Sequence, residues 1–341
     1  MDYLTFASTI QSCVIIVSED IMLKSIFIII DILLVLLIVG AIMSFNFAVK
    51  RKSEDKRKKE GTGIDKATTE GWSIYKDKVK AGRNWFKEID KKSVKLKSFD
   101  DLILKAYYLP ADNPKGTVLL SHGYMSNGYN DFACMYEYLH NAGYNILNIF
   151  HRGCGQSSGE YICFGANERF DILSWLTFLN ALNGEKQDIF IYGISLGASA
   201  ALMACGLDLP GNVRGVIADC PFTNGWDEIG HMMKKKYHLP KFPLLYIVDG
   251  FCKLRAKFSL KEANCLDAVK TMNIPLLLIH GGSDDYVPTS MGQAIYDAAT
   301  GEKELLIVPG AGHGLSFLTD EEAYKEKLNA FLERNASKTA D

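Results

Sequence analysis

The chain has 341 residues, of which 48% are hydrophobic and 23% charged, and its formal net charge is −2. These proportions are typical of globular proteins, so they exclude a disordered or fibrous chain. Because binding to nucleic acid needs a strong positive excess, we expect no nucleic-acid partner. The length allows one large domain or two of ordinary size.

The N-terminal part contains a long apolar segment. Residues 26–49 read IFIIIDILLVLLIVGAIMSFNFAV and hold one charged residue, Asp31. About 20 apolar residues are enough to cross a bilayer as a helix, and a helix without a polar face would have to be buried on all sides in a soluble protein. We therefore predict a transmembrane helix over 26–49, preceded by an N-terminal segment at 1–25, so that the protein is located in a membrane.

The basic residues near this segment predict its orientation. Seven Lys and Arg lie in KRKSEDKRKKE at 50–60, whereas Lys24 stands alone before the apolar segment. By the positive-inside rule, the catalytic part is expected in the cytoplasm. A chain that starts at Met22 would have a short N-terminus with Lys24, and this favours the extracellular side. The orientation and the start site both stay open at this point.

Eight cysteines are spread along the chain without a C-x-x-C pair. This spacing gives no support for a zinc or redox motif, so we expect no metal. Scattered cysteines in a chain of this length are typical of thiols that are kept reduced in the cytosol.

A polar stretch at 50–70 predicts an exposed linker between the membrane segment and the rest of the chain. Apolar residues then recur at helical spacing and predict an amphipathic helix that docks on the following domain; the alternative is a helix lying free on the membrane surface. These residues are Trp72, Tyr75, Val79, Phe86 and Ile89.

From Ser93 onward, short apolar runs alternate with helical patterns. Continuous apolar strands separated by helices predict an α/β fold, with a mostly parallel sheet covered on both faces and an antiparallel hairpin at its start. The eight predicted strands are 94–99, 102–109, 117–121, 145–150, 188–192, 213–218, 275–280 and 304–308. The helical stretches between them include 129–141, 166–182, 196–206 and 289–299.

A gap of about 55 residues without a strand follows Asp219, which is far longer than a usual crossover. It predicts an inserted helical cap at about 221–270. The domain as a whole is expected over 71–335, followed by a disordered tail at 336–341.

The sequence GISLG at 193–197 lies between a predicted strand and a predicted helix of small residues. A G-x-S-x-G in this setting forces a sharp turn that lifts the serine hydroxyl above the sheet. Ser195 is therefore the candidate nucleophile.

A serine nucleophile needs a base, and the base needs an orienting acid. His313 lies in the glycine-rich PGAGHG after the last predicted strand and is the candidate base. Asp284 and Asp285 follow the strand before it; the position of Asp284, three residues before Val287, favours it as the acid. The chain order Ser, Asp, His is the one expected for this type of sheet.

An oxyanion hole is expected from two backbone N–H groups. One belongs to Leu196, directly after the nucleophile, and the other to Tyr124 in HGYMSNG after the third predicted strand. We expect His122 to shape that loop and His280 to pack at the end of its strand, with neither taking part in catalysis.

Together these motifs resemble the α/β-hydrolase superfamily over residues 93–335, and in particular bacterial membrane-anchored serine hydrolases of the prolyl-oligopeptidase and monoglyceride-lipase-like branches. The motifs are HGYMSN (122–127), GISLG (193–197), DCPF (219–222), HGGSDDYVP (280–288) and GAGHG (310–314). The resemblance implies a helical cap that roofs the site and sets the choice of substrate. It also shows one departure, because the family's usual D-x-R-G-x-G-x-S reads FHRGCGQS at 150–157 and lacks the acidic residue.

The expected reaction is acyl transfer from a small-molecule ester or lipid-like substrate to water, without a metal or organic cofactor. A serine peptidase of the aminopeptidase or prolyl-oligopeptidase type is an alternative, although no acidic pair for a substrate amino-terminus is identifiable. A catalytically silent, membrane-tethered binding module is the second alternative. The cap region carries nine basic and five acidic residues. This excess suggests contact with anionic lipid, with an ordinary solvated surface as the alternative.

Overall fold

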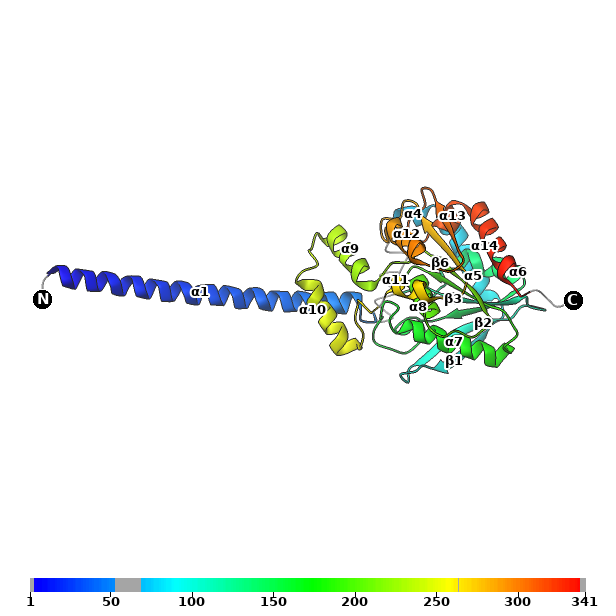
Figure 1. Cartoon of the computed structure of the whole chain (residues 1–341), viewed down its shortest axis with the longest axis horizontal. Helices are drawn as coiled ribbons and strands as arrows, with labels where there is room; N and C mark the ends of the chain where they lie inside the picture. The colour runs from blue at the N-terminus through cyan, green and yellow to red at the C-terminus, as the bar shows by residue number, and fades with distance from the viewer. Residues whose placement is uncertain (1–2, 53–68, 263, 338–341) are drawn as a thin grey trace.

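The computed structural model describes residues 3–52, 69–262 and 264–337. Helix α1 (Tyr3–Ala48) runs away from the rest of the molecule as one long rod (Figure 1). It contains the apolar stretch Ile21–Ala48, which is long enough to cross a membrane. Most of the expected linker and the last four residues of the expected tail lie outside the described residues.

The core of the molecule is one eight-stranded sheet in the order β1-β2-β4-β3-β5-β6-β7-β8. β1 pairs with β2, and β2 with β4, in antiparallel register, whereas all the other pairs are parallel. The strands are β1 (Lys92–Lys97), β2 (Ile103–Leu109), β3 (Gly116–Ser121), β4 (Tyr144–Ile149), β5 (Ile189–Ile194), β6 (Val213–Asp219), β7 (Leu276–Gly281) and β8 (Lys303–Val308). The predicted fold class and the antiparallel first hairpin are confirmed.

The strands form where they do because both faces of the sheet are covered. Along β3, Val118 and Leu120 belong to the apolar cluster on one face, and Leu119 to the cluster on the other. One face is covered by α7 (Glu168–Asn183), α8 (Leu196–Cys205), α11 (Cys265–Thr271) and α12 (Thr289–Ala298). The other is covered by α5 (Lys76–Glu88), α6 (Ala133–Asn141), α13 (Ser316–Thr319) and α14 (Glu321–Asn335).

The predicted amphipathic helix is present as two helices, α4 (Thr69–Ser73) and α5, because the chain turns at Ile74 and Tyr75. α5 is docked on the domain and does not lie free. Its Phe86 is fully buried and stacks on Tyr136 of α6, with the ring centroids 3.8 Å apart. The stack joins the segment after the linker to the hydrophobic core.

The inserted cap consists of α9 (Gly225–Tyr237), α10 (Leu244–Phe251) and a π-helical turn, η1 (Cys252–Ala256). Figure 1 shows α9 and α10 beside the C-terminal turns of α1. By contrast, α11 packs against α8 and α12 and helps to cover the sheet. The C-terminal end of the predicted insertion therefore belongs structurally to the main body.

We predict that Phe86→Ala destabilises the protein by about 3–5 kcal/mol, because it opens a cavity between α5 and α6. Thermal unfolding in detergent, followed by tryptophan fluorescence, measures the effect. The exposed neighbour Lys87 provides the control, since Lys87→Ala should change stability by no more than about 0.5 kcal/mol. Equal melting temperatures for the two variants would show that α5 is not part of the core.

Candidate active site

Ser195 lies in a sharp turn between β5 and α8. Its φ of +56° is a conformation that side chains other than glycine rarely adopt. The turn depends on the flanking glycines: a Cβ at Gly193 would lie 2.4 Å from the carbonyl oxygen of Gly197, and one at Gly197 would lie 1.9 Å from that of Ser121. The N–H of Ser195 donates to the carbonyl oxygen of Asp219 at the end of β6, at 2.8 Å.

The structure brings Ser195, His313 and Asp284 together. Nε2 of His313 lies 2.9 Å from Oγ of Ser195, and Nδ1 lies 2.7 Å from Oδ2 of Asp284. All three residues are buried. Asp285 instead points to the surface, where it pairs with Lys235 of α9. Of the two neighbouring aspartates, only Asp284 can orient the imidazole.

Asp284 is held as a carboxylate by its surroundings. Its Oδ1 accepts the N–H groups of Tyr286 and Val287, at 3.0 and 2.9 Å. Burial opposes ionisation, but His313 and His280 outweigh it and keep the pKa of Asp284 well below its usual range. His280 is fully buried, as expected of a packed histidine, and its Nε2 also lies 3.4 Å from the carboxylate.

The loop that carries Tyr124 is ordered by Asp131, a residue that the sequence analysis missed. Asp131 accepts the N–H of Gly123 at 2.7 Å and the hydroxyl of Ser126 at 2.8 Å. Leu196 opens α8, so its N–H belongs to the first turn, where backbone donors have no partner within the helix. The pairing of these two amides at an oxyanion stays a prediction.

His122 is part of the framework of the same loop. Its Nδ1 lies 2.8 Å from the carbonyl oxygen of Gly123, and its Nε2 accepts the N–H of His151 at 3.1 Å. Burial lowers the pKa of His122 to about 4, so the ring is neutral at physiological pH. It has no contact with Ser195 among the hydrogen bonds of the described residues.

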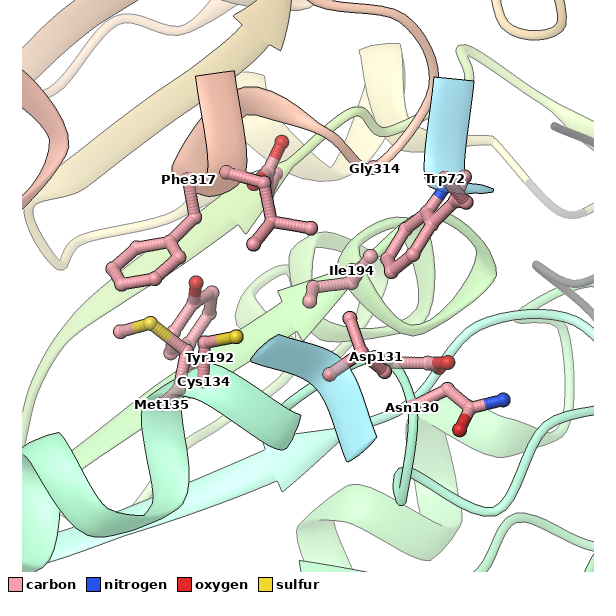
Figure 2. Close-up of a pocket in the computed structure, with 12 residues that line it drawn as sticks. Trp72, Asn130, Asp131, Cys134, Met135, Tyr192, Ile194, Gly314 and Phe317 are labelled. Carbon is pink, nitrogen blue, oxygen red and sulfur yellow. The ribbon is translucent and has the colours of Figure 1, made fainter. Parts of the chain in front are cut away.

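A hydrogen bond joins the loop around His313 to α4. The indole N–H of Trp72 donates to the carbonyl oxygen of His313 at 3.4 Å. Figure 2 shows Trp72 beside Gly314, at one side of a cavity of about 20 Å³. Tyr324 of α14 donates to Asp219 at 3.0 Å, and burial raises the pKa of that carboxyl to about 6.

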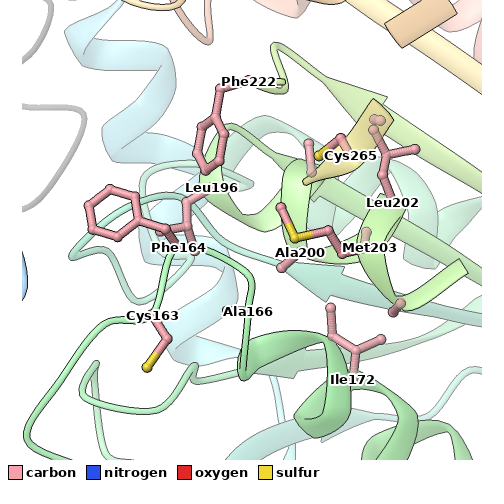
Figure 3. Packing of buried hydrophobic residues seen from close by; sticks show 14 of the residues in the cluster. Cys163, Phe164, Ala166, Ile172, Leu196, Ala200, Leu202, Met203, Phe222 and Cys265 are labelled. Carbon is pink, nitrogen blue, oxygen red and sulfur yellow. The ribbon is translucent and has the colours of Figure 1, made fainter. Parts of the chain in front are cut away.

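A second cavity, of about 460 Å³, opens above Ser195 and has the size of a typical ligand pocket. Its walls are mainly apolar and come from the Tyr124 loop, α8, α9, α10 and the last turns of α1. Figure 3 shows Phe164, Leu196 and Phe222, three of its wall residues, side by side. Nothing in the sequence indicated that α1 contributes to this wall.

Glu228 of α9 also lines the cavity and was not singled out from the sequence. Both of its carboxyl oxygens are buried and have no hydrogen-bond partner. Burial, with a smaller contribution from the charge of Asp284, raises the pKa of Glu228 well above its usual range. This shift favours the protonated, neutral form of the side chain in the cavity wall.

Among the described residues, one group of side chains has the spacing of metal ligands. It consists of Cys220, Asp284 and His313, whose donor atoms lie within 4.8 Å of one another. Both ring nitrogens of His313 already face Ser195 and Asp284. Burial also raises the pKa of the Cys220 thiol well above its usual range, which keeps it protonated and a poor ligand. The donor set fits a Ser–His–Asp arrangement better than a metal centre.

Known proteins share this architecture. A family model described as serine aminopeptidase, S33, matches residues 112–249, and one described as TAP-like protein matches residues 251–341. The esterase Pf2001 of Pyrococcus furiosus superposes with a TM-score of 0.60 at 25% identity, over 73% of this chain and 92% of its own. The chain belongs to the α/β-hydrolase superfamily.

Two relatives of this α/β-hydrolase match it over different shares of its length. The uncharacterized protein YqkD of Bacillus subtilis is 28% identical over 278 residues, which are 82% of this chain and 88% of the relative. The lysophosphatidylserine lipase ABHD12 of Xenopus tropicalis is 28% identical over 177 residues, half of this chain but only 43% of the lipase.

The hydrolase departs from its family's pattern at Phe150, where an acidic residue is usual. Arg152, two residues later, is buried and binds two carboxylates, Asp171 on α7 and Asp100 in the β1–β2 turn. The loop after β4 is thus fixed by Arg152, and the departure leaves the arrangement at Ser195 intact.

We predict that Glu228→Gln makes the protein more stable relative to the natural chain as the pH rises from 5 to 8. Because the folded-state pKa of Glu228 is raised, the native protein must keep a proton that the unfolded chain releases above its own pKa of about 4.3. The natural chain loses up to about 1.4 kcal/mol of stability per pH unit in this window, and the amide variant does not.

Melting temperatures across this pH range measure the difference between the two proteins. Glu88→Gln, at an exposed position on α5, is the control and should follow the natural chain. Parallel curves for Glu228→Gln and the natural chain would contradict a neutral Glu228.

Proposed function

We propose that this α/β-hydrolase is a serine hydrolase that cleaves carboxylic esters of lipid-like acyl chains through a covalent acyl-enzyme. The observation that carries the proposal is the chain of short contacts from Ser195 through His313 to Asp284. The apolar cavity above Ser195 supports an acyl chain as the group to be bound.

In the proposed reaction, Nε2 of His313 takes the proton of Ser195 as Oγ attacks the ester carbonyl carbon. Asp284 stabilises the imidazolium that forms, and the N–H groups of Tyr124 and Leu196 stabilise the oxyanion, each contributing about 3–4 kcal/mol. The imidazolium then protonates the leaving alkoxide. Water, activated by the same ring, attacks the acyl-enzyme and releases the carboxylic acid, which restores Ser195.

An ester is favoured over a peptide by the charge of the cavity. An aminopeptidase needs an anionic group to hold the ammonium of its substrate. Among the described residues that line the cavity, Glu228 is the only acidic one, and its burial disfavours the charged form. Two similar proteins carry the names esterase and lysophosphatidylserine lipase. The family model named for serine aminopeptidases keeps the peptidase as the rival to be tested.

The proposal includes membrane anchorage through α1. Its stretch Ile21–Ala48 has 28 residues and is long and apolar enough to span a bilayer. The basic residues after it favour a catalytic domain on the cytoplasmic side. A substrate of lipid character would then be presented at the membrane on which the enzyme resides.

We predict that a fluorophosphonate probe labels the full-length protein in detergent, and that Ser195→Ala abolishes labelling and lowers the turnover of nitrophenyl esters by at least about a thousandfold. Ser93→Ala, at an exposed position on β1, should leave both unchanged. A natural chain that resists the probe would favour a silent binding module.

We also predict that the enzyme cleaves nitrophenyl esters faster than aminoacyl anilides, since the one acidic residue among the described lining, Glu228, is buried in a way that disfavours its charged form. The two substrates are compared by kcat/KM in the same detergent. Faster cleavage of the anilides would replace the esterase proposal with the peptidase.

A further inference from the structure

The C-terminal turns of α1 are packed firmly on the hydrolase domain. Ala41, Phe45 and Val49 are buried, although most of the described part of α1 is exposed. The ring of Phe45 lies against the rings of Tyr161 and of Phe251, the last residue of α10. The ring centroids are 5.7 and 6.0 Å from that of Phe45. These contacts make the end of α1 part of the domain's hydrophobic core.

Hydrogen bonds fix the same end of the helix. The carbonyl oxygen of Val49 accepts the N–H of Ile162 at 2.8 Å. The guanidinium of Arg51 donates to the carbonyl oxygens of Ser157 and Gly155, at 2.6 and 3.1 Å. The residues that follow α1 are therefore fixed in place by hydrogen bonds to the segment after β4.

One further bond joins α1 to the proposed catalytic machinery. The hydroxyl of Tyr124 donates to the carbonyl oxygen of Ala48 at 2.8 Å. Tyr124 is also the residue whose backbone N–H is proposed to bind the oxyanion. Its side chain reaches α1 while its main chain belongs to the loop beside Ser195.

The same turns of α1 form one wall of the cavity above Ser195. Met43 and Phe47, one turn apart, line it together with Ser44 and Ala48. Other walls come from α9 and α10, through residues such as Met232 and Leu244. A substrate chain lying in this space touches α1 directly.

The length of the apolar stretch indicates where this wall lies relative to a bilayer. The 28 residues of Ile21–Ala48 measure about 42 Å at 1.5 Å per residue. A hydrocarbon core of about 30 Å uses about 20 of them, which leaves about eight for packing on the domain. Ala41 is the first fully buried residue of the stretch. A bilayer that covers the exposed part before Ala41 therefore ends close to the cavity wall, which begins at Met43.

The cap around α1 presents apolar side chains to solvent. Phe242 is 71% exposed and Leu254 65%, and Leu239 and Tyr246 are also largely exposed. Lysines 234, 235 and 236, at the end of α9, lie in the same cap. Because α9 and α10 lie beside the emerging helix (Figure 1), a bilayer spanned by α1 would meet the cap, whose exposed side chains include these apolar ones.

We propose that α1 is a specificity-determining wall of the substrate site: the acyl chain enters from the bilayer past Met43 and lies along Phe47, with its ester at Ser195. This inference rests on the proposed ester hydrolysis and adds the path and the fit of the acyl chain. The transmembrane helix then selects substrate as well as holding the enzyme at the membrane.

The test replaces Met43 by Trp in the full-length protein, reconstituted in phosphatidylcholine vesicles. We expect turnover of a palmitoyl monoester to fall by about tenfold, because the larger side chain fills the outer end of the cavity. Turnover of an acetyl ester should fall far less, because a two-carbon acyl group occupies only the part of the cavity next to Ser195. Ile42→Trp, on the same helix but outside the cavity lining, is the matched control and should keep both activities.

Phe47→Ala provides a second variant that widens the cavity and should shift the preference toward longer or branched acyl chains.

The exposed apolar surface of the cap is tested by the double substitution Phe242→Glu and Leu254→Glu. These changes should reduce turnover of the palmitoyl ester in vesicles and leave turnover of the soluble acetyl ester unchanged.

The outcomes separate this inference from the proposed function. If the natural chain is labelled by the fluorophosphonate probe but Met43→Trp and Phe47→Ala keep its chain-length profile, α1 is not a wall of the site. If the paired glutamates instead convert a dimer to a monomer without affecting vesicle turnover, the cap surface binds a second copy of the chain, and entry from the bilayer is wrong. Failure of labelling in the natural chain would remove the proposed function itself.

Discussion

The site depends on the close approach of two backbones, those of α8 and β3. A single methyl group at Gly197 would lie within 2 Å of the carbonyl oxygen of Ser121. The first turn of α8 can therefore approach β3 this closely only because residue 197 is glycine. This approach places Ser195 in its strained conformation beside Gly123, whose own Cβ would come 3.6 Å from that of Ser195. The end of β3, the nucleophile and the Tyr124 loop are thereby fixed relative to one another before any substrate is bound.

Around this approach, the structure uses buried polar groups to hold loops in place. Asp131 orders the loop after β3, Arg152 the loop after β4, and Asp219 connects the serine turn to α14. An unsatisfied buried polar group costs about 1–3 kcal/mol, so each fully bonded one favours a single loop conformation. Glu228 differs from these three groups, because neither of its carboxyl oxygens has a hydrogen-bond partner, and it lines the cavity above Ser195.

The strands could be predicted closely because a parallel sheet buries both faces. Each predicted strand lies within two residues of the observed bounds at either end, as with 117–121 for β3 and 213–218 for β6. The positions of Ser195, Asp284 and His313 followed from glycine-rich turns at strand ends, which the sequence displays directly.

Other features depend on contacts between distant segments, which no local pattern records. Asp131 binds the amide of Gly123, eight residues earlier, and no periodic pattern in the sequence marks this contact. In the sequence, Glu228 belongs to the polar residues of an amphipathic helix. The packing of α11 on α8 shortens the inserted region, although the sequence between Asp219 and Pro275 shows no boundary there. The contribution of Met43 and Phe47 to the cavity requires α1 to meet the cap, which composition alone does not indicate.

The bond between Tyr124 and Ala48 has a consequence for the life of the protein in a cell. With α1 as the proposed membrane anchor, a protease that cut the chain between Lys52 and Thr69 would remove the covalent link to it, and a body that then dissociated from α1 would keep every side chain of the Ser–His–Asp set. That body would lack one wall of its cavity and the acceptor for the Tyr124 hydroxyl. Shedding would therefore produce an impaired fragment, and the activity would be confined to the surface where the helix is embedded.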